Sequence, residues 1–295
     1  MITSDTLLKI RRIELRTRKL VNDSFAGSYH AIFKGRGIEF DAVRPYEPGD
    51  DIRSIDWNVT ARAGEPFIKR FVEERELTVM LVIDTSASSF FGTVNQQKHD
   101  LAAEFGAVLA YAAISNQDRV GLLLFSDEIE LYVPPRKGRN HVLLLIRDLL
   151  AAQPAQKGTN ISLALKTLNR VLKSRAIVFL VSDFLAAQDE YAADLAITAR
   201  YHDLIGVVLS DPLESVWPDV GLLGLQDAET ETVRWIDTAQ KNWTRKFDKQ
   251  AQRFQQMRDE MLYKVGIDRI DLPSDGDYLE ALTTFFRRRM QRLAK

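Results

Sequence analysis

Three apolar segments of strand length end directly in an aspartate. They read LTVMLVID (77–84), RAIVFLVSD (175–183) and DLIGVVLSD (203–211). A run that is apolar on both faces is typical of a buried parallel strand. Helix-like segments separate the three runs, and parallel strands need such crossovers. This order predicts an α/β fold with a doubly wound, mostly parallel sheet.

The remaining segments of residues 77–273 complete the expected main domain. Each follows from its apolar period and its flanking turn residues. Helices are expected at 95–115, 141–153, 160–174, 187–202 and 238–264, strands at 119–126 and 265–273, an antiparallel edge strand at 128–135, and a hairpin at 221–237.

Three further segments flank this domain. Residues 1–27 contain an expected amphipathic helix, and residues 274–295 contain another, YLEALTTFFRRRMQRL. Residues 28–76 are rich in turns and short alternations, which predicts a small β-rich unit. Within it, IEFDAV, SIDWNV and EPFIKRFVE are expected to be strands or extended arms.

Composition excludes several classes of protein. The chain has 295 residues, a net charge of −1 and no cysteine. Disulfides, thiolate metal sites and cysteine nucleophiles are therefore excluded, and nucleic acid is not expected as the main partner. The first residues lack the apolar core of a signal peptide, and no window is long and apolar enough for a membrane span. We expect a cytoplasmic protein.

The strand-ending aspartates mark the expected functional edge. In open α/β sheets, ligands bind at the carboxyl ends of the strands, where Asp84, Asp183 and Asp211 would lie. Several enzyme classes do not fit this edge. The stretch DTSASSFFG lacks the lysine of a phosphate-binding loop, and the chain has no G-x-S-x-G or G-x-G-x-x-G motif.

Two alternatives remain for the edge. One is a metal-dependent, phosphatase-like enzyme that uses Asp84, although the second acid that haloacid-dehalogenase-like enzymes need is replaced here by Ser86. The other is purely structural. Asp84, Ser86 and Asp183 would cap the helices that follow them, and Thr159 or Asn160 would cap the helix after it.

An oxygen-ligand metal site accounts for more of the pattern. Asp84, Ser86 and Ser88 are spaced two apart on one loop. Thr159 lies in a loop before a helix, within KGTNIS, and Asp183 ends the next predicted strand. Two carboxylates and three hydroxyls suit a hard divalent cation, with Mg²⁺ the first expectation and Mn²⁺ or Ca²⁺ as alternatives.

The motifs D-T-S-A-S, G-T-N and V-S-D, in this order, resemble the metal-ion-dependent adhesion site of von Willebrand factor A-like domains, which have a Rossmann-like sheet. The resemblance implies that Ser86, Ser88 and Thr159 contribute hydroxyls. It implies that Asp84 and Asp183 act directly or through water. It further implies a non-enzymatic module that binds an acidic side chain of a partner through the cation.

The N-terminal block VRPYEPGDDIRSIDWNVTAR, followed by FVEERE, resembles the domain of unknown function 58 family. Its members place this block immediately before a von Willebrand A-like domain, and many are membrane anchored. Their genes often neighbour those of MoxR-type AAA+ ATPases. The resemblance therefore implies an adaptor or co-chaperone whose partner is such an ATPase, its client, or both.

Four side chains are candidates for contact with that partner. Phe90 and Phe91 follow the metal loop and would form an apolar rim, unless they pack beneath the loop. Arg53 and Trp57 belong to a polar block that either clasps the N-terminal unit to the main domain or forms a partner surface. The block comprises Arg44, Asp50, Asp51, Arg53, Asp56 and Trp57.

Overall fold

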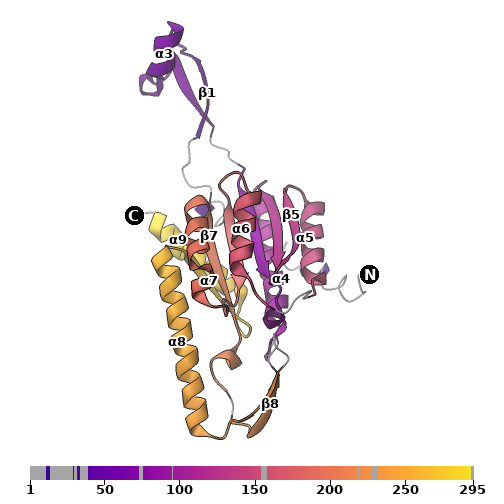
Figure 1. Cartoon of the computed structure of the whole chain (residues 1–295). Helices are drawn as coiled ribbons and strands as arrows, with labels where there is room; N and C mark the ends of the chain where they lie inside the picture. Colours follow the sequence, from indigo (N-terminus) through magenta and orange to yellow (C-terminus); the bar gives the residue numbers. More distant parts are fainter. Residues whose placement is uncertain are drawn as a thin grey trace.

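A six-stranded sheet flanked by helices forms the centre of the computed structural model (Figure 1). The strand order is β10-β7-β6-β3-β4-β5, and β5 alone of these six is antiparallel to its neighbour. The doubly wound, mostly parallel sheet predicted from the sequence is confirmed. The structure describes residues 11–13, 29, 32–33, 39–72, 76–94, 96–153, 158–217, 219–226 and 232–293.

The strands of this sheet coincide with the apolar runs of the sequence. Their bounds are β3 (Thr78–Asp84), β4 (Arg119–Phe125), β5 (Ile129–Arg136), β6 (Ile177–Ser182), β7 (Asp203–Ser210) and β10 (Asp268–Pro273). Alternate side chains of β3 enter two separate cores. Val79, Leu81 and Ile83 lie in one, whereas Met80 and Val82 lie in the other, as expected for a strand covered on both faces.

Helices cover both faces of the sheet. The first core contains residues of α4 (Lys98–Ser115), α5 (Arg139–Ala151) and α9 (Tyr278–Leu293). The second contains residues of α6 (Ile161–Val171), α7 (Gln188–Tyr201) and the last turns of α8 (Lys241–Val265). The helix α4 is buried almost all round, and the described N-terminal residues lie in the same core.

Aromatic contacts join that N-terminal part to the first core. Ile13, Tyr29 and Ile32 are buried there. The ring of Phe33 lies 6.2 Å from that of Phe179 on β6 and 5.9 Å from that of Phe286 on α9, both edge to face. Residues 11–13 are helical, and the rest of the helix expected within 1–27 lies outside the described residues.

A small antiparallel unit precedes the sheet. It consists of β1 (Glu39–Pro45) paired with β2 (Phe67–Val72), and between them η2 (Ile52–Ser54) and α3 (Trp57–Ala63). The prediction that SIDWNV is extended is wrong, because α3 begins within it. The side chain of Asp56 accepts hydrogen bonds from the backbone N–H groups of Asn58 and Val59, and this cap starts the helix.

The polar block stabilises this unit internally. The guanidinium of Arg44 donates to both carboxylate oxygens of Asp50, at 2.9 and 2.8 Å. Asp51 caps η2, and Asp56 caps α3. Figure 1 shows the unit standing off the end of the sheet where the strands begin. These contacts of Arg44, Asp51 and Asp56 lie within the unit, and Trp57 is 67% exposed on it. Whether the block also serves a partner stays a prediction.

The opposite end of the molecule carries the expected hairpin. Strands β8 (Leu222–Gln226) and β9 (Val233–Asp237) pair antiparallel, with Leu222 opposite Asp237. They extend beyond the end of the sheet where the strands finish (Figure 1), and α8 follows them in the chain. Between β7 and β8 lies the short helix η4 (Pro212–Glu214).

Both edge strands are irregular or charged. On β5, Pro134 and Pro135 coincide with a register shift between Val120 and Leu122 of β4. On β10, the guanidinium of Arg269 pairs with Asp271 at 3.1 Å and with a carboxylate of α8. Neither edge presents a regular apolar strand.

Acidification below pH 6.5 should destabilise the fold through His202. This buried residue follows α7, and its Nδ1 accepts a hydrogen bond from the N–H of Ala176 at 3.3 Å. Burial, and then the nearby Arg175, lower its pKa. The unfolded chain therefore binds the proton more readily, and stability is lost as pH falls from about 6.5 toward the folded-state pKa. Urea unfolding at several pH values should show this loss in the wild type and a smaller one in His202→Asn. Equal losses would contradict it.

Candidate functional site

The strand order brings two of the candidate aspartates together. Strands β3 and β6 are parallel neighbours, with Ile83 opposite Val181. Asp84 and Asp183 therefore emerge at the same edge, and they are only 1% and 4% exposed. Two buried carboxylates at one edge need compensating donors or cations.

Hydrogen bonds fix both oxygens of Asp84. Its Oδ1 accepts from the backbone N–H of Ser86 at 2.9 Å, and its Oδ2 accepts from the hydroxyl of Ser182 at 2.6 Å. Burial, followed by repulsion from Asp183, raises the pKa of Asp84 to about 7. Burial and the neighbouring carboxylate thus outweigh the two hydrogen bonds, which on their own would lower this pKa.

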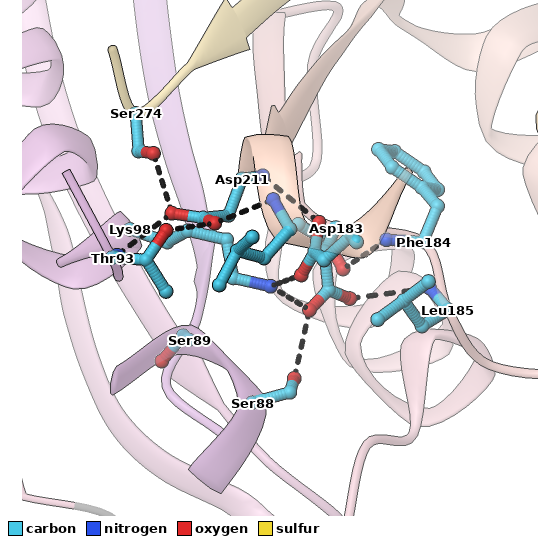
Figure 2. Close-up of polar contacts among 12 residues, drawn as sticks. Ser88, Ser89, Thr93, Lys98, Asp183, Phe184, Leu185, Asp211 and Ser274 are labelled. Carbon is cyan, nitrogen blue, oxygen red and sulfur yellow. Dashed lines mark hydrogen bonds and ion pairs between the residues drawn. The ribbon is translucent and has the colours of Figure 1, made fainter. Parts of the chain in front are cut away.

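A continuous line of polar contacts leads from the loop after β3 to Asp183. The hydroxyls of Ser86 and Ser88 lie 3.2 Å apart, and Ser88 donates to Oδ2 of Asp183 at 2.8 Å. The other oxygen of Asp183 accepts from the N–H of Leu185 at 3.1 Å. Figure 2 shows Ser88 and Leu185 approaching Asp183 from different sides. Four of the five predicted site residues are therefore directly connected.

The fifth, Thr159, lies outside this line of contacts. The N–H of its neighbour Asn160 donates to the carbonyl of Ser126 at 2.7 Å, which places the loop at the end of β4. Among the described residues, no hydrogen bond joins Thr159 to the other four. Asn160, rather than Thr159, caps α6 by accepting from the N–H of Leu163 at 2.9 Å.

The capping alternative fails for the other candidates. The residues that precede α4 and α7 are Gln97 and Ala187, neither of which makes a side-chain cap. Ser86 precedes the short helix η3 (Ala87–Phe90) without capping it. The hydroxyl of Ser86 and the carboxylate of Asp183 therefore serve something other than a long helix.

The third strand-ending acid, Asp211, has a structural role. It accepts from the N–H and hydroxyl of Thr93 at 2.9 and 2.5 Å, from the hydroxyl of Ser274 at 2.7 Å, and from the N–H of Leu213 at 3.0 Å. Burial alone would raise its pKa, but these hydrogen bonds outweigh burial and lower it. Asp211 thereby ties the loop after η3 to the ends of β7 and β10 (Figure 2).

Sequence reasoning missed Lys98, the first residue of α4. Its side chain is fully buried, and Nζ donates to Oδ2 of Asp183 at 2.8 Å and to Oε1 of Glu214 at 2.5 Å. Burial acts to lower its pKa, but the two carboxylates outweigh that effect and raise it, so the ammonium stays charged. A signal was present, because a cation in the first turn of a helix opposes the helix dipole and needs a specific partner.

The chemistry of these residues fits a small divalent cation. Ligands of an octahedral Mg²⁺, at 2.0–2.1 Å from the ion, lie roughly 3 Å from one another. The 3.2 Å between the hydroxyls of Ser86 and Ser88 matches that spacing. Among the described residues, no group of three or more His, Cys, Asp or Glu side chains is placed to hold a metal. A cation at this edge would therefore use serine hydroxyls beside the two carboxylates.

The candidate partner residues lie in three different settings. Phe90 stacks on His99, with ring centroids 4.5 Å apart, so it packs against α4. Phe91 is 39% exposed. It lines a pocket of about 410 Å³ between the site, η4 and α8, which Asp183, Glu214 and Trp217 also line. Arg53 and Trp57 belong to the unit at the other end of the sheet, as Figure 1 shows.

Known proteins resemble this chain, one over most of its length and another over a shorter stretch. It is 34% identical over 227 residues to the uncharacterized protein Rv1480 of Mycobacterium tuberculosis (strain ATCC 25618 / H37Rv), covering 76% of this chain and 71% of that protein. It is 26% identical over 111 residues to the uncharacterized protein YeaD of Bacillus subtilis (strain 168), covering 38% of this chain and 26% of that protein.

Solved structures show more distant likenesses. The conserved hypothetical protein BatB from Bacteroides thetaiotaomicron has a TM-score of 0.47 at 12% identity, covering 73% of this chain and 99% of that one. The SpRpn10 VWA domain has a TM-score of 0.40 at 10% identity, covering 71% of this chain and 94% of that one.

None of the described helices is both long enough and apolar enough to cross a membrane.

A family model matches residues 42–257, which include most of the β1–β2–α3 unit, the sheet from β3 to β7 and most of α8. The matched segment thus contains every residue of the candidate site. Its description is protein of unknown function DUF58. The chain belongs to the DUF58 family.

Proposed function

We propose that this protein is a non-enzymatic interaction module that binds an acidic side chain of a partner protein through a divalent cation, with Mg²⁺ as the expected ion. The observation that carries the proposal is the line of contacts from Ser86 through Ser88 to Asp183. It places two hydroxyls beside two buried carboxylates at the carboxyl edge of the sheet. That edge is where open α/β sheets bind ligands.

Each residue has a distinct task in this proposal. Ser86 and Ser88 provide neutral oxygen ligands, and Asp84 and Asp183 provide negative charge directly or through water. Thr159 would join them from the neighbouring loop. When bound, the cation supplies a positive centre that accepts one further carboxylate oxygen, because carboxylates that act through water offset its charge only in part and the hydroxyls add no negative charge.

The geometry around Asp84 supports binding rather than catalysis. Its side chain is 1% exposed, and both of its oxygens accept hydrogen bonds. Such burial hinders attack on a bulky phosphate ester, whereas a small ion or a water needs only one of the lone pairs that these two hydrogen bonds leave unused. The phosphatase-like alternative lacks a favouring observation here.

The neighbouring pocket indicates what lies beside the acidic residue of the partner. Its lining is predominantly apolar and includes Phe91, Leu185 and Trp217, while Asp183 reaches it from the candidate site. A large apolar side chain adjacent to the partner's acid would fill this space. We propose a MoxR-type AAA+ ATPase, its client, or both as the partner, which is what the sequence resemblance implies.

Capture of the partner should depend on both the cation and the hydroxyls. The purified chain, immobilised, is exposed to a lysate of its native host with Mg²⁺ or with EDTA, and retained proteins are identified by mass spectrometry. We expect proteins that wild type retains with Mg²⁺ to be lost with EDTA and with Ser86→Ala plus Ser88→Ala. The physical reason is that loss of two ligands removes the cation and, with it, the bridge to the partner.

The matched control is Ser115→Ala, which removes a hydroxyl at the far end of α4, where it donates to the carbonyl of Tyr111. This variant should retain the same proteins as wild type. Retention of the same proteins under every condition would sink the cation mechanism. The same preparations are assayed with Mg²⁺ and a generic phosphate ester, since turnover that disappears in Asp84→Asn would favour the phosphatase alternative instead.

A further inference from the structure

Lys98 places a permanent positive charge inside the candidate site. Its side chain is 0% exposed, and its ammonium bridges Asp183 of the site and Glu214 of η4. The lysine begins α4, where the helix dipole disfavours a cation. Its position is therefore maintained by the two carboxylates, as Figure 2 shows for the contact with Asp183.

Asp183 has little remaining capacity for a metal. Its Oδ2 accepts from both Lys98 and Ser88 at 2.8 Å, and its Oδ1 accepts from the N–H of Leu185. A carboxylate offers about four lone-pair sites, so three are already in use. The oxygen nearest the hydroxyl ligand is the one that the ammonium occupies.

The ammonium also lies close to the space that a cation would take. Nζ of Lys98 and Oγ of Ser88 contact the same oxygen at the same distance, so they are no farther apart than twice that distance. A divalent ion bound to Ser88 would therefore have the ammonium as a near neighbour. Two like charges at such separation repel strongly in a buried site.

We propose that Lys98 is a tethered cation that competes with a divalent ion for Asp183 and so sets the metal affinity of the site. This inference rests on the proposed function, whose site it regulates. Glu214 provides the alternative position for the ammonium, because its Oε1 binds Nζ while its Oε2 accepts from the N–H of Asp211 at 2.9 Å. Withdrawal of Lys98 toward Glu214 frees Asp183 for the incoming ion.

Binding of Mn²⁺ to the full chain, measured by isothermal titration calorimetry, tests this directly. Lys98→Met keeps the length and removes the charge, and we expect it to bind Mn²⁺ roughly 10- to 100-fold more tightly than wild type. Lys98→Arg keeps the charge and should not gain affinity. Mn²⁺ should also raise the unfolding temperature of Lys98→Met more than that of wild type. If Lys98 has only a structural role, its replacement should lower the unfolding temperature by the same amount in Mn²⁺ as in EDTA.

Glu214→Gln tests the proposal with the lysine in place, because it should change the Mn²⁺ affinity in the opposite direction to Lys98→Met. It retains an oxygen for the N–H of Asp211 but weakens the alternative position, so Lys98 stays on Asp183 and Mn²⁺ should bind more weakly than to wild type. Equal or weaker affinity in Lys98→Met, with unchanged affinity in Glu214→Gln, overturns the competition.

The serine variants separate this failure from failure of the proposed function. If Ser86→Ala plus Ser88→Ala abolishes binding while Lys98→Met leaves the affinity of wild type, the cation site stands and the role of Lys98 is wrong. If the serine variant binds Mn²⁺ as wild type does, the ion lies elsewhere and the proposed site is wrong. If no variant binds Mn²⁺, both are overturned.

Discussion

Asp211→Ala should lower the free energy of unfolding by about 3–5 kcal/mol, as expected when a buried charged hydrogen-bond network is broken. The carboxylate accepts four hydrogen bonds, two of them from Thr93 and one from Ser274. Its removal leaves the hydroxyl of the buried Ser274 and the partly buried N–H groups of Thr93 and Leu213 without this acceptor, and each buried group left unsatisfied costs about 1–3 kcal/mol. Urea unfolding at neutral pH measures the change.

The matched control for this prediction is Asp127→Ala. Asp127 also follows a strand of the sheet, β4, but it is exposed. Its removal should change stability by no more than about 0.5 kcal/mol. A small loss in Asp211→Ala, comparable with that control, would mean that the loop after η3 is not held by this carboxylate.

Phe179→Ala should cost about 3–5 kcal/mol, the range for truncating a buried aromatic side chain. Phe179 is fully buried on β6, and its ring meets that of Phe105 on α4 and that of Phe33, each at 6.2 Å between centroids. The substitution therefore removes contacts both within the sheet's first core and to the N-terminal part of the chain. Urea unfolding, followed by far-ultraviolet circular dichroism, measures it.

An exposed apolar residue provides the comparison. Ile197 on α7 is 46% exposed, and Ile197→Ala should change stability by no more than about 0.5 kcal/mol. Phe33→Ala should reproduce part of the effect of Phe179→Ala, because it removes one of the two ring contacts. If Phe33→Ala leaves stability unchanged, the ring contact between Phe33 and Phe179 does not contribute to stability.

The main domain was predictable because its signals are strong and local. A run such as LTVMLVI, apolar on both faces, suits a strand covered on both sides, and β3 indeed serves two cores. Parallel strands place their carboxyl ends at one edge, so the meeting of Asp84 and Asp183 followed from topology. The exact neighbours of Thr159 depend on loop conformation, which no periodicity specifies.

The N-terminal unit was harder because two local signals conflict there. SIDWNV alternates apolar and polar residues as a strand does. Asp56 nevertheless captures the N–H groups of Asn58 and Val59, and this cap selects a helix that Gly64 ends in the left-handed conformation. Over so short a segment, the helix cap at Asp56 decided the conformation, and the apolar–polar alternation did not.

Lys98 was missed for a different reason. In the sequence it stands among polar residues at a helix start, NQQKHD, which predicts an exposed face. Its carboxylate partners come 85 and 116 residues later along the chain. Only the assembled fold brings Asp183 and Glu214 around it, so its burial could not be derived from neighbours in the sequence.

The proline pair on β5 affects whether the sheets of two copies of the protein can pair edge to edge. Neither Pro134 nor Pro135 has an N–H to donate to a ladder, and the register shift beside them bends the edge. At the opposite edge, the charges of Arg269 and Asp271 oppose docking of another strand. An additional strand would find an interrupted row of donors on one side and a charged border on the other. Extension of the sheet by strands of further copies is therefore disfavoured at both of its edges.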